Sequence, residues 1–337
     1  MMVIWKGLVL MKKLINDPAL AIDQMIQGIQ YGHPELRRLG EVSALANPNS
    51  GRKVLLVSGG GSGHEPLDFG YIGPGLLDVA ITGLIFTPPD STAIIRAITA
   101  LDSQHDYLFI VKNFQEDVQN FSAAATFLNA DGYNVKVVLV SDDQSVDPKT
   151  LQTRGRGVAG TVFMFKLLGA AADKGATLTE LAALAKVIND NLYTLGVALS
   201  GTETPGAQAP SFVLADDEVA YGVGIHGEPG YRNEPLESSE LLARELVNKI
   251  RIAAQFATGQ KLAVLINGLG GLPLMDQYVF TNDVVQLLTL EGLAPTFIKT
   301  GTYLTSYGMR GASVTVLRLQ DDQWYDWLKR SVGGYGW

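Results

Sequence analysis

The strongest constraint on the fold is the alternation of short apolar runs with longer segments of helical periodicity in the first half of the chain. The strand-like runs are Val54–Val57, Val79–Thr82, Leu108–Val111 and Val135–Val140, and the helix-like segments are Ser91–Leu101, Asp117–Ala130 and Val158–Lys174. Strands separated by helices of this length form βαβ units, in which the strands lie parallel. We therefore predict an α/β fold that binds its ligand at the carboxyl ends of the strands.

The second half of the chain repeats this kind of pattern after a helix-like segment at Leu178–Asn191. Its strand-like runs are Leu195–Leu199, Val219–Val223, Leu262–Ile266, Thr296–Thr300 and Ser313–Leu319, and its helix-like segments are Ser239–Ala257 and Asn282–Leu290. A chain of 337 residues exceeds what one core usually supports. We predict two α/β domains, residues 11–192 and 193–337, each with a largely parallel or mixed sheet flanked by helices.

The two ends of the chain carry separate expectations. We expect Met11 to be the natural start, because the segment from Met11 to Pro18 has the character of a domain's first residues. The tail from Asp321 holds three of the four tryptophans, and the pattern is compatible either with docking on another surface or with loose packing.

Composition excludes several functional classes. The net charge of −8 at pH 7 argues against direct binding to nucleic acid, which relies on clustered Lys and Arg. The absence of cysteine excludes disulfides, thiolate metal sites and cysteine nucleophiles. No signal peptide is recognisable, and no run of about 18 apolar residues predicts a membrane span. We expect a cytoplasmic protein without a membrane segment.

Two histidines stand in glycine-rich frames. The chain has four histidines. His64 lies in GGGSGHEP (Gly59–Pro66), and His226 lies in GVGIHGEPG (Gly222–Gly230). Glycine permits sharp turns and close approach of other groups. The repeated frame, with a glutamate shortly after each histidine, favours presentation to a ligand over a purely structural role.

Other sites that a glycine-rich loop can form do not fit. A P-loop needs Gly-Lys-Ser/Thr, and a dinucleotide fingerprint needs a third glycine where His64 stands. Zinc requires three or more ligands in close geometry. We expect no cofactor and no metal. We expect the backbone N–H groups of Gly60, Gly61 and Ser62 to form a nest for a ligand oxygen.

Several motifs in a fixed order resemble one family. GGGSGHEP, IVKN (Ile110–Asn113) with Asp117 after it, RGRGVAGT (Arg154–Thr161) and VGIHGEPG (Val223–Gly230) are similar to the K subunit of bacterial dihydroxyacetone kinase, and the resemblance runs from about Met11 to Leu319. It implies a homodimer of two-domain chains that binds dihydroxyacetone. It also implies that His226 attacks the carbonyl carbon of the ketone to form a covalent hemiaminal.

The resemblance implies roles for the remaining site residues. His64 would hydrogen-bond the captured substrate, and Asp117 would accept a proton from its hydroxyl. Gly61 would supply a backbone N–H, with Lys112 close by. From the residues alone, Glu228 is a candidate to hold the proton on the second nitrogen of His226. Asp117 alone would be interpreted as a helix N-cap.

Two departures from the family pattern affect phosphoryl transfer. The segment Lys112–Asp117 reads KNFQED, so that Glu116 replaces the usual glycine, and Thr87-Pro88-Pro89 replaces Thr-Ser-Pro. We expect Glu116 to restrict the backbone and to repel a phosphoryl donor in a partly dry cleft. The sequence therefore favours a DhaQ-type co-activator that senses dihydroxyacetone with a DhaS-like transcriptional regulator. The alternative is a catalytic K subunit of a PTS-dependent kinase that works with an ADP-bearing L subunit.

Overall fold

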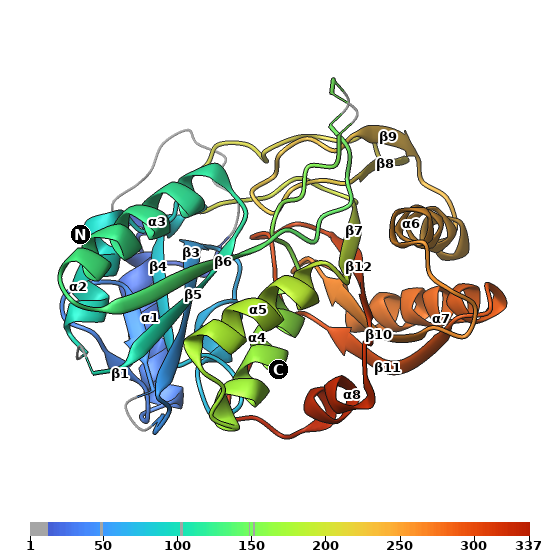
Figure 1. Ribbon diagram of the computed structural model, residues 1–337. Coiled ribbons are helices and arrows are strands. Elements are labelled where there is room, and N and C mark those ends of the chain that lie inside the picture. Colours follow the sequence, from blue (N-terminus) through green and yellow to red (C-terminus); the bar gives the residue numbers. More distant parts are fainter. Residues whose placement is uncertain (1–12, 48–49, 102–103, 148, 151) are drawn as a thin grey trace, which may run out of the picture.

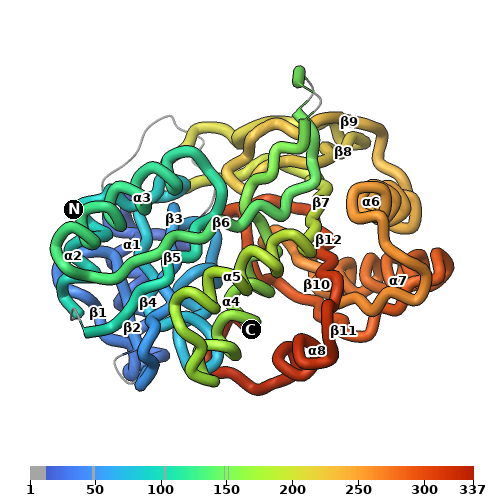
Figure 2. The backbone as a smooth tube through the Cα atoms, in the orientation of Figure 1, coloured from blue at the N-terminus to red at the C-terminus, as the bar shows by residue number. Residues whose placement is uncertain are grey.

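Two six-stranded sheets lie on either side of a central helical layer (Figure 1), and the chain path is seen in Figure 2. The computed structural model describes residues 13–47, 50–101, 104–147, 149–150 and 152–337. The expected start at Met11 lies outside these residues. The two mixed sheets with flanking helices confirm the predicted fold class.

The first sheet is parallel at its centre and antiparallel at one edge. Its strands are β1 (Arg37–Arg38), β2 (Ala44–Ala46), β3 (Val54–Ser62), β4 (Val79–Ile85), β5 (Asp106–Lys112) and β6 (Asn134–Val140), in the order β1-β2-β4-β3-β5-β6. The glycine run was expected to follow the strand as a loop. That expectation was wrong, because Gly59 to Ser62 continue β3, and Gly59, Gly60 and Ser62 pair with β4 around an irregularity at Gly61.

Helices cover both faces of this sheet. The helices α2 (Ser91–Thr99) and α3 (Gln115–Ala130) pack together on one face, and α4 (Thr161–Asp173) and α5 (Leu178–Asn189) pack on the other. The helices η1 (Pro18–Leu20) and α1 (Ala21–Gly32) precede β1, and the short η2 (Phe69–Tyr71) lies between β3 and β4. The N-cap role predicted for Asp117 is wrong: Phe114 occupies the N-cap of α3, and Asp117 lies within the first turn.

The central helix α4 joins the cores of the two halves. Its sequence TVFMFKLLGAAAD is apolar on all sides, which is typical of a buried helix. All of its residues except the last are buried. Side chains such as Val162 and Phe163 belong to a core that also includes Leu56 of β3 and Leu265 of the second sheet. The first sheet and the second sheet therefore share one hydrophobic core.

The second sheet is largely antiparallel. Its strands are β7 (Leu192–Ala198), β8 (Glu218–Tyr221), β9 (Arg232–Pro235), β10 (Lys261–Gly268), β11 (Ala294–Gly301) and β12 (Gly311–Arg318), in the order β11-β10-β12-β7-β8-β9. Only the β10–β11 pair is parallel among these described strands. Along the sequence, the last strand of the first sheet ends at Val140 and the first strand of the second sheet begins at Leu192. The helices α4 and α5 occupy the interval between them.

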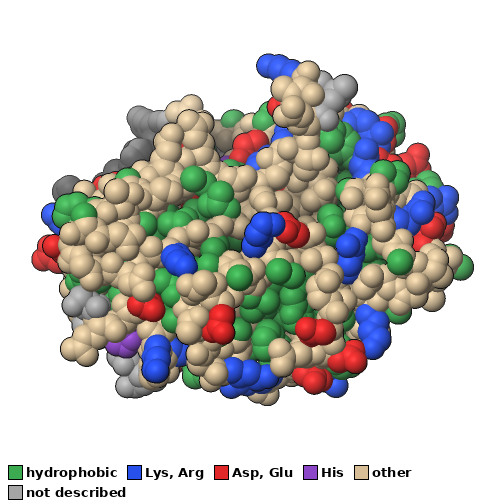
Figure 3. All heavy atoms as spheres, viewed as in Figure 1, with side chains coloured by type: hydrophobic (Ala, Val, Ile, Leu, Met, Phe, Trp, Pro, Cys, Tyr) green, Lys and Arg blue, Asp and Glu red, His purple; other side chains and the backbone are tan. Residues whose placement is uncertain are grey.

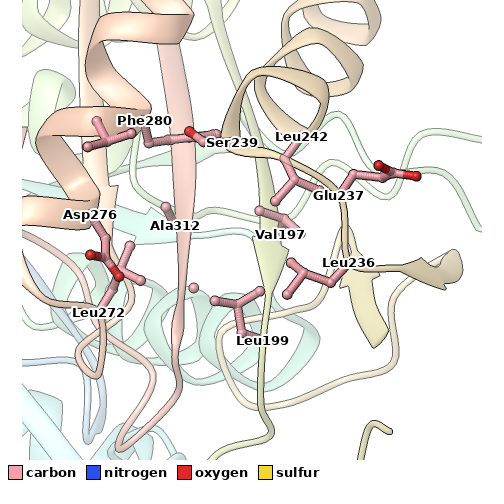
Figure 4. A pocket seen from close by; sticks show the side chains of 12 residues that line it. Val197, Leu199, Leu236, Glu237, Ser239, Leu242, Leu272, Asp276, Phe280 and Ala312 are labelled. Atoms are coloured by element: carbon pink, nitrogen blue, oxygen red, sulfur yellow. The ribbon is translucent and has the colours of Figure 1, made fainter. Parts of the chain in front are cut away.

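The outer face of the second sheet carries α6 (Ser239–Ala254) and α7 (Leu274–Leu290). The helix predicted from Asn282 begins earlier, at Leu274. Between α6 and α7 lies a cavity of about 250 Å³ with a mostly apolar lining, which includes Val197, Leu242 and Phe280 (Figure 4).

The carboxyl-terminal tail docks on the first half of the molecule. It contains α8 (Asp322–Lys329), whose Trp324 and Trp327 are buried. Beyond α8, the N–H groups of Gly333 and Gly336 donate to the carbonyls of Pro74 and Gly70 at 2.9 and 2.7 Å. The docked alternative for the tail is therefore correct.

The visible face of the molecule carries charged side chains of both signs (Figure 3). Basic and acidic side chains are interspersed on the face in Figure 3, and they do not form one large basic patch there. None of the helices in the described ranges is both long enough and apolar enough to cross a membrane.

Candidate functional site

The two glycine-framed histidines meet at the carboxyl ends of the first sheet's strands. His64 follows β3, and His226 lies in the loop between β8 and β9. Their ring centroids are 4.9 Å apart. Phe86, which follows β4, stacks on His64 at 5.0 Å, and Phe114, which follows β5, meets His226 edge-on at 4.6 Å. Segments from both halves of the chain thus build one ring cluster.

Phe86 is a site residue that the sequence reasoning missed. Its φ of 57° is in the left-handed region, which a bulky residue rarely adopts. Such a conformation costs about 1–3 kcal/mol and is concentrated at functional sites. It places the Phe86 ring on His64. The sequence signal was its position directly after a buried strand, before Thr87-Pro88-Pro89.

His64 offers a buried acceptor without a partner. Its Nδ1 lies 2.8 Å from the carbonyl oxygen of Thr305, and since a carbonyl only accepts, Nδ1 carries the proton. Nε2 is then an acceptor, and it is buried with no hydrogen-bond partner. Burial, reinforced by the charge of His226, lowers the pKa of His64 well below its usual value. The ring is therefore neutral at pH 7.

Asp117 offers a second acceptor of this kind. Its side chain is buried in the first turn of α3, and Oδ1 has no hydrogen-bond partner. Burial raises the pKa of Asp117 to about 6, and the charge of Lys112 offsets only part of this rise. A Cβ on Gly60 would lie 3.0 Å from Oδ1 of Asp117 and 3.1 Å from Nζ of Lys112. Glycine at this position leaves room beside the buried carboxylate oxygen.

Lys112 and Ser62 lie in the site region, but their side chains already have partners. Nζ of Lys112 donates to the carbonyl of Gly59 at 2.6 Å and pairs with Asp68 at 3.2 Å. Oγ of Ser62 donates to the carbonyl of Gly83 at 2.8 Å.

The glycine run serves close packing of backbone segments. A Cβ on Gly61 would lie 2.6 Å from the backbone nitrogen of Thr87. The N–H of Gly63 donates to the carboxylate of Glu65 at 3.1 Å. A nest that binds a ligand oxygen at Gly60, Gly61 and Ser62 stays a prediction.

His226 and Glu228 form the pair that the sequence suggests. Nδ1 of His226 lies 3.2 Å from Oε1 of Glu228, and the backbone N–H of His226 donates to Oε2 at 3.0 Å. Burial by itself would raise the pKa of Glu228. The hydrogen bond and charge of His226, together with Arg156, outweigh burial and lower that pKa to about 2. An ionised carboxylate only accepts, so Nδ1 is the donor, and in the neutral imidazole Nε2 is the nitrogen with the free lone pair.

Glu116 does not lie in the environment that the sequence analysis predicts for it. Its side chain is exposed, so it does not stand in a partly dry cleft. Repulsion of a donor phosphate through water is worth about 1 kcal/mol at 4 Å. Glu116 also lies in helical backbone at the start of α3, and among the described residues only Phe86 and Gln255 combine a side chain with positive φ. Replacement of a glycine by Glu116 is therefore tolerated locally.

No group of three or more His, Cys, Asp or Glu side chains is arranged to hold a metal ion within the described part of the chain.

We expect Asp117→Asn to stabilise the unliganded protein at pH 8. Because burial raises the pKa of Asp117 from 3.8 to about 6, holding its carboxylate in the folded state costs about 3 kcal/mol above pH 6. This cost grows as the pH rises from about 4 to about 6, and it is absent below pH 4, where folded and unfolded chains are both protonated. Urea unfolding should show a gain of about 1–3 kcal/mol at pH 8 and little gain at pH 4. Equal gains in the free energy of unfolding at both pH values would contradict the raised pKa of Asp117.

Comparisons with known proteins agree with the motifs. The Dak1 domain model matches residues 27–333. The dihydroxyacetone-binding subunit DhaK of the PTS-dependent dihydroxyacetone kinase of Lactococcus lactis subsp. lactis (strain IL1403) is 43% identical over 330 residues, covering 97% of this chain and 99% of the relative. The DhaKLM operon coactivator DhaQ of the same strain is 42% identical over 328 residues, covering 96% of this chain and 100% of the relative. The solved structure of a dihydroxyacetone kinase operon co-activator, DhaQ, has a TM-score of 0.88 at 41% identity, covering 93% of this chain and 97% of that one. The chain therefore belongs to the Dak1 domain family, as the order of its motifs predicts.

Proposed function

We propose that this protein captures dihydroxyacetone as a covalent hemiaminal on His226. One observation carries the proposal: two buried acceptors without partners, Nε2 of His64 and Oδ1 of Asp117, belong to the site around His226. Dihydroxyacetone has a hydroxyl on each side of an electrophilic carbonyl carbon. Its two hydroxyls match the two acceptors, and its carbonyl carbon matches an imidazole nucleophile.

As its cellular role, we propose a cytoplasmic co-activator of the DhaQ type, which reports the bound ketone to a DhaS-like transcriptional regulator. The sequence Thr87-Pro88-Pro89, which stands where the family commonly has Thr-Ser-Pro, supports this role over catalysis. The homology to a named operon coactivator is compatible with it. Homodimerisation, the division at residues 192 and 193, and ligand contacts by Gly60, Gly61, Ser62 and Lys112 belong to the same proposal.

The second candidate is the substrate-binding K subunit of a PTS-dependent dihydroxyacetone kinase. Two observations favour it. Asp117, with a pKa of about 6, is a carboxylate at pH 7 and is suited to accept a hydroxyl proton. Glu116 is exposed, so it repels a phosphoryl donor less than the sequence alone indicates.

Carbon-13 NMR tests the capture directly. Dihydroxyacetone labelled at its carbonyl carbon should give a tetrahedral-carbon signal that is bound to the protein and exchanges with free ketone. A bound signal that stays trigonal would reject the hemiaminal.

A second assay separates the two roles: the protein is mixed with an L subunit, its phosphoryl donor and the ketone. Turnover of at least about 1 s⁻¹ would establish the kinase role, and its absence beside clear capture supports the co-activator.

A further inference from the structure

A buried arginine stands behind the pair of Glu228 and His226. Arg156 belongs to the segment RGRGVAGT, which precedes α4, and it is 8% exposed. Its Nε donates to Asp143 at 2.7 Å. Its Nη2 donates to Oγ of Ser145 at 3.0 Å and to the carbonyl of Gly222 at 2.9 Å. These bonds fix the plane of the guanidinium, and the third nitrogen, Nη1, lies 4.0 Å from Oε2 of Glu228.

Gly224 provides the space in which the arginine and the glutamate meet. A Cβ at this position would overlap both Oε2 of Glu228 and Nη1 of Arg156. The N–H of Gly224 also donates to the carbonyl of Glu228 at 3.0 Å, which fixes the backbone that carries the carboxylate. Glycine is therefore required at position 224, because any side chain there would collide with Arg156 and Glu228.

The contacts form a chain of charged groups that ends at the imidazole. Asp143 holds Arg156, Arg156 faces Glu228, and Glu228 accepts from Nδ1 of His226. Each group limits the orientation of the next. An imidazole attacks through the nitrogen that lacks a proton, so the tautomer of His226 decides whether Nε2 is available as a nucleophile.

We propose that Arg156 is the positioning residue that keeps Glu228 ionised and oriented, and thereby fixes the proton of His226 on Nδ1. Its role in capture rests on the proposed function. In the capture step, the Nε2 lone pair forms the bond to the carbonyl carbon, and the electron pair of the C=O bond moves to oxygen. That oxygen gains one proton and the imidazole loses the proton on Nδ1, so the net proton count is unchanged. Glu228 stabilises the imidazolium that forms in between.

Nitrogen-15 NMR of the imidazole tests the proposal without any ligand. In the unliganded wild-type protein, we expect the neutral imidazole of His226 to be the Nδ1–H tautomer. In Arg156→Met, we expect a shift toward the Nε2–H tautomer and at least a tenfold loss in the equilibrium constant for the ketone adduct. The matched control is Arg52→Met, which removes another buried arginine with two carboxylate partners, Asp78 and Asp173, outside the site.

Each result of the NMR and adduct measurements has a distinct meaning for the proposal. A wild-type Nε2–H tautomer overturns the proposal, even if the arginine variants fail to fold. An unchanged tautomer in Arg156→Met, or an equal change in Arg52→Met, also overturns it. A wild-type Nδ1–H tautomer without any ketone adduct leaves the positioning role standing and rejects the proposed function.

The protonation of His226 and Glu228 depends on other charged groups besides their mutual contact. His64, Asp117, Arg154 and Arg156 all act on His226 or Glu228. The tautomer of His226 is therefore compared between variants at one alkaline pH. Glu228→Gln should reproduce the change, and adding it to Arg156→Met should cause little further change, because both variants remove the same interaction.

Discussion

His226→Ala will leave no tetrahedral adduct with dihydroxyacetone, and the dissociation constant will rise to about 1 mM or weaker. Without the imidazole, the remaining attraction comes from hydrogen bonds to His64 and Asp117. A net contribution of about 0.5–1.5 kcal/mol per neutral bond, somewhat more for the carboxylate, does not hold a small polar molecule tightly. Isothermal titration and carbon-13 NMR measure the two effects.

The matched control is His33→Ala. His33 stacks on Tyr335 at 4.4 Å and takes no part in the ring cluster. This variant should bind the ketone like the wild type. If His226→Ala retains the adduct, another residue is the nucleophile, and the proposed function fails at its chemical step.

Gly59→Ala will destabilise the fold by about 3 kcal/mol or more. A Cβ at Gly59 would overlap the carbonyl oxygen of Ile81 on β4 and lie 3.0 Å from the Phe121 ring on α3. β3 cannot move away easily, because it is paired with β4 on one side and β5 on the other. The midpoint of urea unfolding should fall accordingly.

Gly28→Ala is the matched control for this substitution. Gly28 lies inside α1, and a Cβ there meets no atom within 4 Å. Alanine in a helix interior should stabilise by about 0.5–1 kcal/mol. If Gly59→Ala unfolds at the same urea concentration as the wild type, the close approach of β3 and β4 is not needed for stability.

Local sequence patterns predicted most of the elements, because strand-like runs and helical periodicity are local properties. The predicted runs for β3, β4 and β5 lie within the observed strands, although β3 continues through the glycines to Ser62. The start of α7 was missed for a physical reason. Leu274, Met275, Tyr278 and Val279 are exposed apolar residues, and they obscure the amphipathic pattern of its first turns.

The candidate site was predictable where motifs carry it and not where tertiary contacts build it. His64, His226 and Glu228 stand in recognisable frames. Thr305 does not, although its carbonyl sets the tautomer of His64 from the other half of the chain. The exposure of Glu116 depends on how α3 lies on its sheet, and no local pattern reports that.

The docked tail has a consequence for the order in which segments of this protein can pack during synthesis. Gly336 bonds to Gly70, and the ring of Trp337 stacks near Phe297 at 6.2 Å and contacts Phe163 of α4 edge-on at 6.4 Å. Residues 333–337 therefore close a surface made by much earlier ones, and that surface stays open until they have left the ribosome.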